Sequence, residues 1–423
     1  MAVCKTVWNS LSLTPRGDFR LCSLSNDPKF NESVGFDDQN NVMNILTHSF
    51  EQGINSDKHR AVRLSEQQGE EWHELCSCCE NRENAERDTI QNQSRRQYVN
   101  KVISAPIKFY DTKTGQVPWS PVSLDLHFGN VCNFKCIQCG PQYSNQWYDE
   151  WAAINGFGNN LHENGFGPNK VLLTKNKNDK WIDVNEVKWW ENEIWWEKFD
   201  KLLPTLEHLY LTGGEPMLLK QHDRLLDVII ASGRADQIKL EYDSNLSVIN
   251  PRILDRWTKF KNIDLRVSVD AIGDKFELIR FGGKWNNMVS NIELVKSYQR
   301  QYPHIKIFRL TSCFQIATSH SMIETEEWCN ELGIPLSVRF VDSPKWHSTI
   351  SLPRHMKQQL IDYYSSKPTY MVSDLIVNFL TSHLDVEDLT ELRRFKKFMT
   401  YLDYSRKTNW EAVLPETAAM LKS

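Results

Sequence analysis

The chain has 423 residues, of which 40% are hydrophobic and 25% charged, an ordinary globular composition long enough for two or three domains. Its formal net charge of −4 excludes a global basic field of the kind that attracts nucleic acid. No run of about 18 apolar residues predicts a membrane span.

The ten cysteines all lie within the first 329 residues. The start of the chain lacks a basic segment followed by an apolar core, so we expect no signal peptide. In that setting, ten cysteines predict a reducing compartment and metal ligation instead of disulfides. We therefore expect a cytoplasmic protein with its chemistry in the N-terminal and central parts.

Residues 1–100 are predicted to form a small, cysteine-rich α+β unit. Residues 7–13 alternate like a strand, and after a turn signal residues 18–21 return as a second strand. Such a hairpin would bring Cys4 and Cys22 close together.

The same unit continues with a helix-like pattern at 59–75 that leads into Cys76 and Cys79. Together with the hairpin pair, these residues provide four soft ligands. Four thiolates suit either zinc or an iron–sulfur cluster, and their spacing does not decide between the two. Plain core cysteines are a third interpretation, and Cys78 is a spare thiol for either neighbour.

The central part of the chain alternates strand-like and helix-like segments. Six strands are expected, at 122–128, 208–211, 238–242, 263–269, 305–313 and 335–341. Six β/α units predict an α/β fold, a partial (β/α)6 TIM-like barrel with parallel strands. We place this barrel at 115–345 and a helical C-terminal extension at 346–423.

An insertion at about 155–198 interrupts the predicted barrel and contains a tryptophan-dense segment. One interpretation is a lid or aromatic surface that binds a substrate. The other, which we favour, is a helix whose tryptophan face packs on the barrel.

Three thiols follow the first barrel strand within eight residues, with Cys132, Cys136 and Cys139 forming a C-x3-C-x2-C motif. Closely spaced cysteine thiolates are the usual ligands of iron–sulfur clusters, whereas a structural zinc site takes four protein ligands. Because this loop supplies three, one metal corner stays available for a cofactor or substrate. A chance cluster of reduced, buried cysteines is the alternative.

This motif after a first strand resembles the signature of the radical S-adenosylmethionine (radical SAM) enzymes. The resemblance implies that the three thiolates hold a [4Fe–4S] cluster whose unique iron is chelated by S-adenosylmethionine. It also implies reductive cleavage, with electrons from an external donor, to a 5′-deoxyadenosyl radical that abstracts hydrogen from a substrate. Many members carry an aromatic residue before the third cysteine, where this chain has Gln138.

The strand at 208–211 ends in a Gly-Gly-Glu-Pro sequence. Gly213 and Gly214 let the backbone approach a ligand closely, and the carboxylate of Glu215 can meet an ammonium group. The sequence resembles the GGE motif of radical SAM enzymes, which implies that these residues hold the amino group of S-adenosylmethionine.

Polar residues also end the later strands, where barrels gather their functional groups. Asn245, Ser268 and Asp270 are cofactor-binding candidates at these ends. By the same resemblance, Ser268 and Asp270 lie where ribose hydroxyls are met, and Arg280 where the methionine carboxylate is held. Helix caps or turn formers are the alternative reading of such residues, while Cys313 is either a packing residue or a hydrogen donor.

The N-terminal cysteines resemble a twitch domain, the shortened relative of the SPASM domain, which carries an auxiliary [4Fe–4S] cluster in many radical SAM enzymes. That domain more often follows the barrel, whereas here it precedes it. The resemblance rests on Cys4, Cys22, Cys76, Cys79, Glu83, Ser94 and Arg96. It implies that the four cysteines hold a cluster that relays an electron or binds substrate.

The sequence thus predicts a two-cluster radical SAM enzyme that modifies a peptide or protein. An auxiliary cluster beside such a barrel resembles the arrangement in peptide-modifying enzymes, and the tryptophan-rich insertion would offer surface to an extended chain. Nucleic acid binding would need a basic face, which the composition does not indicate. The alternatives are radical SAM chemistry on a nucleoside or small metabolite, and a non-catalytic metal-binding interaction protein on a decayed barrel.

Overall fold

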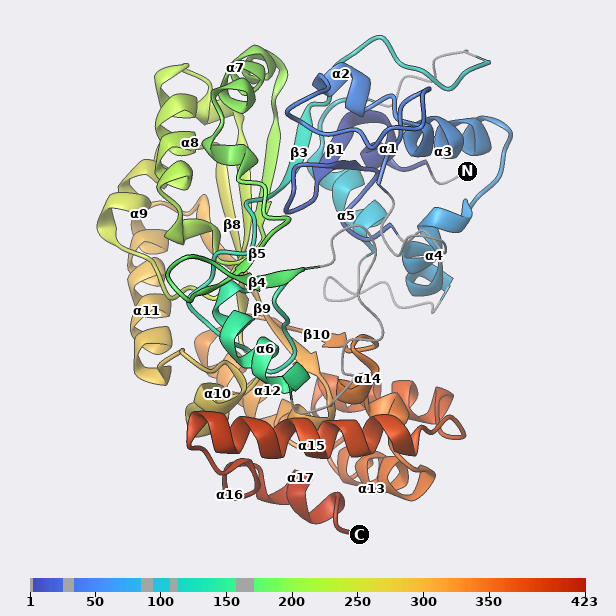
Figure 1. The fold of residues 1–423 in the computed structure, drawn as a ribbon, viewed down its shortest axis with the longest axis vertical. Helices are drawn as coiled ribbons and strands as arrows, with labels where there is room; N and C mark the ends of the chain where they lie inside the picture. Colours follow the sequence, from blue (N-terminus) through green and yellow to red (C-terminus); the bar gives the residue numbers. More distant parts are fainter. Residues whose placement is uncertain (1–2, 26–33, 85–93, 107–112, 157–170) are drawn as a thin grey trace.

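The computed structural model describes residues 3–25, 34–84, 94–106, 113–156 and 171–423. Its centre is an eight-stranded sheet with the strand order β10-β9-β8-β7-β6-β3-β1-β2 (Figure 1). Six of these strands are parallel and stay in chain order: β3 (Ser123–His127), β6 (His208–Thr212), β7 (Lys239–Ser244), β8 (Asn262–Ser268), β9 (Ile305–Phe314) and β10 (Leu336–Phe340). Among the described strands β10 is a free edge, so the sheet is the open arc expected of a partial (β/α)6 barrel.

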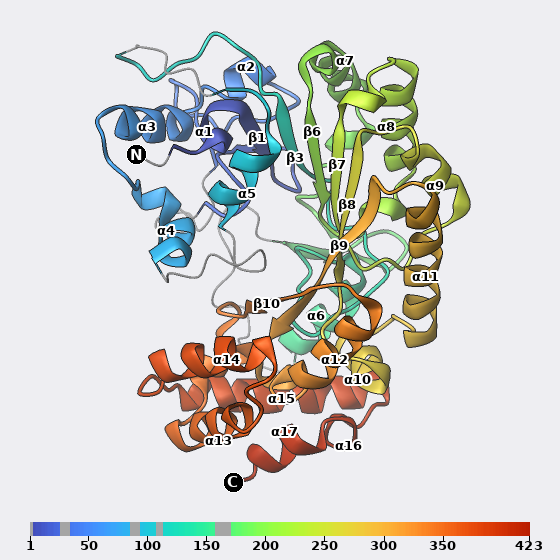
Figure 2. The ribbon, with the colours of Figure 1, turned by 180° about the vertical axis from the view of Figure 1, so that it is seen from behind.

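Helices between the strands cover one face of this sheet (Figure 2). They are α8 (Lys220–Ala231), α9 (Pro251–Trp257), α10 (Gly273–Ile279), α11 (Trp285–Gln301) and α12 (Met322–Leu332). Strand residues alternate between the two faces. On β7, Leu240 and Tyr242 are fully buried in the main hydrophobic core, while the intervening Glu241 lies on the opposite face. Each strand is therefore fixed by an apolar side that packs against helices.

The N-terminal unit consists of α1 (Lys5–Asn9), β1 (Ser10–Leu13), β2 (Phe19–Arg20), α2 (Phe50–Gly53), α3 (Asp57–Gln67), α4 (Ser77–Asn84) and α5 (Arg95–Val102). β1 pairs antiparallel with β2, which confirms the predicted hairpin. In addition, β1 pairs parallel with β3, so this unit extends the barrel sheet by two strands. The sequence did not predict that continuity.

Two predicted boundaries in this unit are wrong. The strand expected at 7–13 begins as helix α1, which turns Val7 and Trp8 into a separate small core. The helix expected at 59–75 ends at Gln67, and Gly69 follows with a φ of +89°. A left-handed glycine of this kind commonly terminates a helix.

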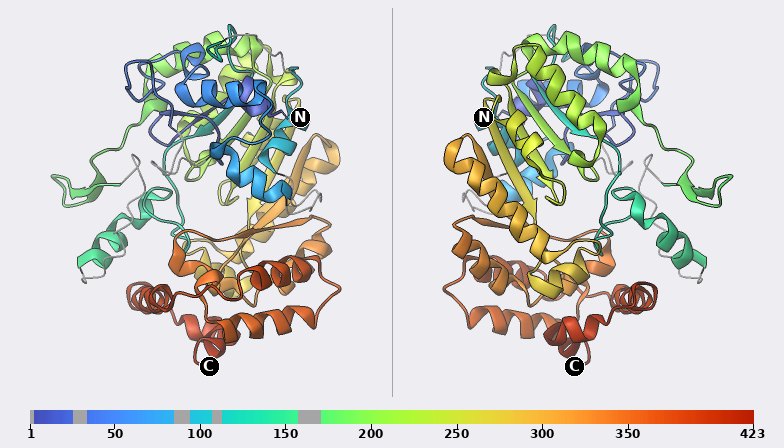
Figure 3. Two further views of the ribbon diagram at one scale, coloured as in Figure 1. Left: turned by 90° about the vertical axis from the view of Figure 1, so that its right-hand side faces the viewer. Right: turned by 90° about the vertical axis from the view of Figure 1, so that its left-hand side faces the viewer.

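The insertion begins with α6 (Tyr148–Gly156), and residues 157–170 of it lie outside the described part of the chain. A two-stranded hairpin, β4 (Leu173–Lys175) with β5 (Trp181–Asp183), projects from the body (Figure 3). Helix α7 (Glu193–Leu202) follows. Four tryptophans are at most 3% exposed, namely Trp189, Trp190, Trp195 and Trp196. The packing interpretation is confirmed for them, and they offer no surface to a substrate.

The C-terminal extension is helical as predicted and lies at the end of the molecule away from the N-terminal unit (Figures 1 and 2). It contains α13 (Arg354–Ser365), α14 (Met371–Ser382), α15 (Leu389–Arg406), α16 (Trp410–Val413) and α17 (Pro415–Met420). Within the described ranges no helix combines the length and apolarity needed to cross a membrane.

Candidate functional site

The loop with Cys132, Cys136 and Cys139 leaves the carboxyl end of β3 and is fixed by backbone hydrogen bonds. The amide of Lys135 donates to the carbonyl of Phe281 (2.7 Å), and that of Ile137 donates to the carbonyl of Ile279 (2.9 Å). These bonds tie the loop to the chain that leaves α10, so the three thiols share a defined framework at this end of the sheet.

The glycines after β6 meet the cysteine loop at close range. Gly213 has a φ of +123°, and a Cβ on Gly214 would lie 2.1 Å from the carbonyl oxygen of Val131. The amide of Glu215 donates to that same carbonyl at 2.8 Å. Both glycines are thus required for the contact between the two loops, whereas the sequence analysis had explained them by a bound ligand.

Glu215 is a buried carboxylate, 1% exposed, at the centre of this contact. It accepts hydrogen bonds from the amide of Asn245 (2.7 Å) and the hydroxyl of Ser244 (2.9 Å). Burial raises the pKa of Glu215 to about 7, although these hydrogen bonds act in the opposite direction. A carboxylate held in this way gains stability from a cationic group placed beside it.

Two of the loop thiols have nitrogen donors next to them. The side-chain amide of Asn245 lies 3.7 Å from the sulfur of Cys132, and the guanidinium of Arg280 lies 3.8 Å from the sulfur of Cys136. Hydrogen bonds to ligand sulfurs are one of the means by which a protein sets the potential of an iron–sulfur cluster.

The pKa values of the loop thiols reflect their proximity. Burial raises the pKa of Cys132 to about 12. A hydrogen bond with Cys139 lowers the pKa of Cys136 against the effect of burial, and Arg280 lowers it further. The same hydrogen bond, together with burial, raises the pKa of Cys139. A cationic centre that takes all three as thiolates would fit this arrangement.

Asp270, directly after β8, organises the neighbouring side chains. It forms an ion pair with Arg280 (2.9 Å), accepts a hydrogen bond from the Gln138 amide, and accepts another from the amide of Cys313 (2.8 Å). Gln315 donates to Gln138 at 3.4 Å. Gln138, which replaces the aromatic residue common in the family, therefore belongs to a polar network beside the cysteine loop.

The C-terminal extension supports the cysteine loop from outside the sheet, a contribution that the sequence analysis missed. Glu150 on α6 pairs with Lys135 of the loop (2.9 Å) and with Arg406 of α15 (2.8 Å). The Arg406 guanidinium also lies 4.7 Å from the ring centroid of Trp147 and 4.5 Å from that of Phe281. No motif marked this arginine, because its partner carboxylate is 256 residues away in the chain.

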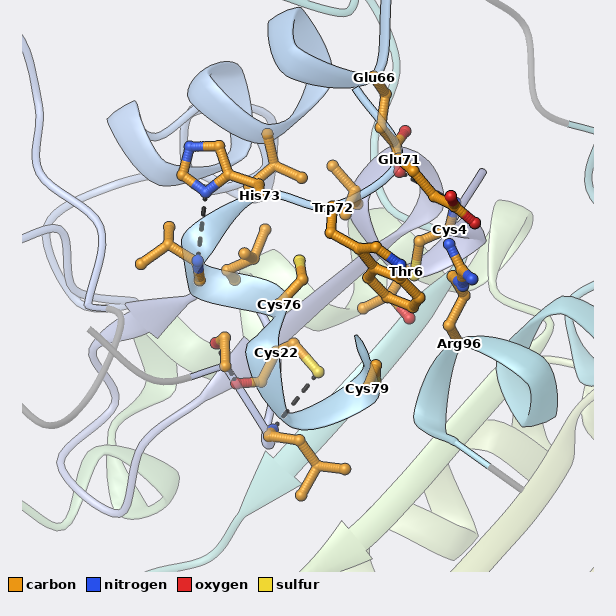
Figure 4. Close-up of a pocket in the computed structure, with 16 residues that line it drawn as sticks. Cys4, Thr6, Cys22, Glu66, Glu71, Trp72, His73, Cys76, Cys79 and Arg96 are labelled. Atoms are coloured by element: carbon orange, nitrogen blue, oxygen red, sulfur yellow. Dashed lines mark hydrogen bonds between the residues drawn. The ribbon is translucent and has the colours of Figure 1, made fainter. Parts of the chain in front are cut away.

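The four N-terminal cysteines selected from the sequence line a single pocket, together with Trp72 and Arg96 (Figure 4). Burial raises the pKa of the Cys4 thiol to about 12, and the nearby Cys22 and Cys79 raise it further. Cys78 is not among the lining residues. In the described residues no three His, Cys, Asp or Glu side chains are arranged around one metal ion. Four thiols around a shared pocket do suit a cubane cluster, whose cysteine ligands each bind a different iron.

Polar side chains behind this pocket fix its walls. Glu83 accepts hydrogen bonds from the hydroxyl of Ser94 and from Nε of Arg96 (3.1 Å), so these three residues meet as a group. The Arg96 guanidinium lies 3.7 Å from the ring centroid of Trp72. Glu66 accepts from the amide of Cys4 at 3.1 Å.

Comparisons with known proteins bear on the N-terminal unit most directly. The family model SPASM, described as an iron–sulfur cluster-binding domain, matches residues 4–80. This match confirms the prediction of a SPASM-like unit and includes all four pocket cysteines. No curated protein matches the chain.

Three solved structures illustrate the similarity in fold. Streptococcus suis SuiB bound to S-adenosylmethionine matches with 17% identity and a TM-score of 0.33, over 59% of this chain and 48% of that one. The protein anSMEcpe with bound AdoMet and Kp18Cys peptide matches with 14% identity and a TM-score of 0.36, over 57% and 59%. The radical S-adenosylmethionine methyltransferase TsrM from Kitasatospora setae matches with 12% identity and a TM-score of 0.32, over 51% and 34%. The aligned part is thus about half of SuiB, and values this low assign no activity to the chain.

Proposed function

We propose that this chain is a radical SAM enzyme with two [4Fe–4S] clusters and that it modifies a peptide or protein. The observation that carries the proposal is the convergence of three loop thiols with Glu215, Asn245 and Arg280 at one end of a parallel (β/α)6 sheet. Three thiols with a buried carboxylate beside them suit a cluster that leaves one iron for a cofactor carrying an amino group.

The cofactor, when bound, supplies the radical chemistry, and the chain supplies ligands and orientation. Cys132, Cys136 and Cys139 would hold the cluster. Glu215 would receive the amino group of S-adenosylmethionine, because its raised pKa shows that it lacks a cationic partner. Burial of Glu215 also keeps water away from this contact.

Asp270 and Arg280 take a joint role in this proposal. Asp270 already accepts from Arg280, Gln138 and the Cys313 amide, so we assign it to positioning these groups before any contact with ribose. Arg280 remains the candidate for the methionine carboxylate, and Ser268 at the end of β8 the candidate for a ribose hydroxyl. The glycines Gly213 and Gly214 keep the two loops in contact.

A peptide or protein substrate is supported by the N-terminal unit. Its match to an iron–sulfur cluster-binding domain, beside a partial barrel, resembles the arrangement in enzymes that modify peptides. The tryptophan-rich segment no longer contributes to this argument, since four of its tryptophans are buried.

Anaerobically reconstituted protein, given a strong reductant, should convert S-adenosylmethionine to 5′-deoxyadenosine. A variant with Cys132→Ala, Cys136→Ala and Cys139→Ala should produce none. Unchanged product from that variant would overturn the assignment. Stimulation of wild-type turnover by peptides and not by RNA would support the substrate class, and the reverse would favour a nucleoside.

A further inference from the structure

The face of the sheet opposite the crossover helices, here called the inner face, carries two rows of polar and charged side chains. The alternation that buries Leu265 and Val267 in the core places Asp264 and Arg266 on this inner face. Strand register then aligns one row across β6 to β9 and a second row beside it. The rows contain Asp125, Tyr210, Glu241, Asp264 and Lys306, and next to them His127, Thr212, Asp243, Arg266 and Arg309.

Most charges in these rows have a partner of opposite sign. Glu241 forms an ion pair with Arg266 and accepts a hydrogen bond from the hydroxyl of Tyr98 on α5 (2.5 Å). Asp264 pairs with Lys239 (2.5 Å) and with Lys306 (3.4 Å). The inner face is therefore a matched set of charges along most of its length.

Arg309 is the exception. It is 6% exposed, its Nε is buried without a hydrogen-bond partner, and its guanidinium forms no ion pair with any described residue. Its recorded neighbour is the ring of Phe308, with the guanidinium carbon 5.2 Å from the centroid. Phe314, by contrast, is an ordinary core residue of the same strand.

A β-bulge places Arg309 on the inner face. Leu265 pairs with Ile307, but the next residue, Arg266, pairs with Arg309, so Phe308 is an extra residue in β9. Bulges re-aim side chains and are over-represented next to active sites. Here the irregularity sets two arginines side by side, which raises the cost of leaving Arg309 without a counter-ion.

The electrostatic surroundings call for one anion. Burial lowers the pKa of Arg309 to about 10, and repulsion from Arg266 lowers it further. A buried charge without a partner is strongly unfavourable. Asp243, the carboxylate beside Arg266 in the same row, has a side chain that is 38% exposed, so solutes reach this row from solvent.

We propose that Arg309 is a substrate-recognition residue that binds a carboxylate of the substrate on the inner face of the sheet. That the ligand is a substrate rests on the proposed function, and the anion site itself rests on the geometry. Arg309 precedes Cys313 by four strand residues, about 13 Å at the rise of a strand. The subsite therefore lies along the inner face from the cysteine loop, on the side of the N-terminal unit that contributes Tyr98.

A carboxylate fits this subsite better than a phosphate. A guanidinium binds either group through two parallel hydrogen bonds. Arg309 offers a single uncompensated positive charge, and Asp243 and Glu241 stand close to it in the neighbouring positions of the sheet. A dianion would be repelled by these carboxylates, whereas a singly charged carboxylate would balance the site.

The test is thermal unfolding of the full-length protein with N-acetylglutamate, against the uncharged N-acetylglutamine and equal ionic strength of sodium chloride. N-acetylglutamate should raise the midpoint of the wild type by about 2 °C or more at saturation, and N-acetylglutamine should not. Arg309→Gln should abolish this shift. Lys306→Gln is the matched control, because it removes a cation that already has a partner from the same face and should keep the shift.

An equal shift with both compounds, no shift in the wild type, or a shift that survives Arg309→Gln would overturn the proposal. A larger Arg309-dependent shift with O-phosphoserine than with N-acetylglutamate would replace the carboxylate by a phosphoryl group and also overturn it. Arg309→Gln should itself unfold at no lower temperature than the wild type without ligand, because it removes an unpaired buried charge. These readouts need no cofactor cleavage, so their failure is distinct from failure of the proposed enzyme activity.

Discussion

The two sets of thiols in this molecule differ in how they are enclosed. The N-terminal pocket holds four cysteines beside a small apolar core that includes Val7, Trp8 and Leu75, and its polar supports come from the same unit. The loop after β3 offers three cysteines, and its supports come from several strands and from the C-terminal extension. A complete ligand set suits a structural or electron-carrying centre, whereas an incomplete one suits a centre that binds a further molecule.

The difference also concerns charge. Glu215, Arg280 and Asp270 surround the loop thiols, and each of them is buried. Around the N-terminal pocket, Glu66 and Arg96 are the charged residues closest to its cysteines that also form named hydrogen bonds. The loop is thus the region in which substitutions of charged residues should have the larger functional effect, and the following changes test that contrast.

The largest effect on folding is expected from Glu150→Gln. This change leaves Arg406, whose side chain is 1% exposed, without its carboxylate beneath the cysteine loop. Removing one partner of a buried ion pair costs about 3–5 kcal/mol of unfolding free energy. Urea denaturation measures the loss, and Glu193→Gln, at an exposed pair with Arg224, is the control that should leave the midpoint unchanged. Equal midpoints for the two variants would contradict a supporting role for the C-terminal extension.

Glu215→Gln should change how stability depends on pH in the protein without cofactor. The pKa of Glu215 is raised from 4.5 to about 7, so its protonated form stabilises the fold below pH 4.5 and this contribution is lost as pH rises toward 7. The glutamine variant lacks this loss, so its stability relative to the wild type should increase by about 3 kcal/mol across that window. Denaturation curves at pH 4.5, 5.5 and 7 check the trend. Parallel pH profiles for the two proteins would show that Glu215 has an ordinary pKa.

Arg96→Gln should weaken the N-terminal pocket by a smaller amount. It removes the bonds to Glu83 and the contact with the Trp72 ring, together worth about 1–3 kcal/mol. The expected result is a lower unfolding midpoint with unchanged 5′-deoxyadenosine formation in the absence of substrate. Lys101→Gln on the same helix is the exposed control. Loss of that uncoupled cleavage in the Arg96 variant would show that the two centres are not separable.

Cys78→Ala should have the smallest effect. The pocket is lined by Cys76 and Cys79 and not by Cys78, so the variant should bind as much iron as the wild type. Cys76→Ala and Cys79→Ala should each reduce the iron content. A comparable reduction in the Cys78 variant would mean that this thiol replaces a neighbour as ligand.

The sequence predicted those parts of the structure that depend on local pattern. The six strands, the helix Met322–Leu332 and both thiol sets were found because alternation, helical spacing and short cysteine motifs are visible within about ten to twenty residues. The packing of Trp195 was also the favoured interpretation, because a tryptophan on a helix face usually serves the core.

Features that depend on distant pairing could not be predicted in this way. The parallel pairing of β1 with β3 joins residues more than a hundred positions apart, and no local signal specifies it. The contact of Arg406 with Glu150 is of the same kind. The inner-face position of Arg309 depends on a bulge, which a one-residue shift in register creates and which alternation alone does not reveal.

The most direct test of the account is an iron count combined with cofactor cleavage in two variants. One carries alanine at Cys132, Cys136 and Cys139, and the other carries alanine at Cys4, Cys22, Cys76 and Cys79. From about eight irons per wild-type chain, each variant should retain about four, taking four irons per cubane. Only the loop variant should lose uncoupled formation of 5′-deoxyadenosine. Zinc in place of the iron retained by the loop variant, or cleavage that persists in it, would contradict the assignment of two iron–sulfur centres with separate roles.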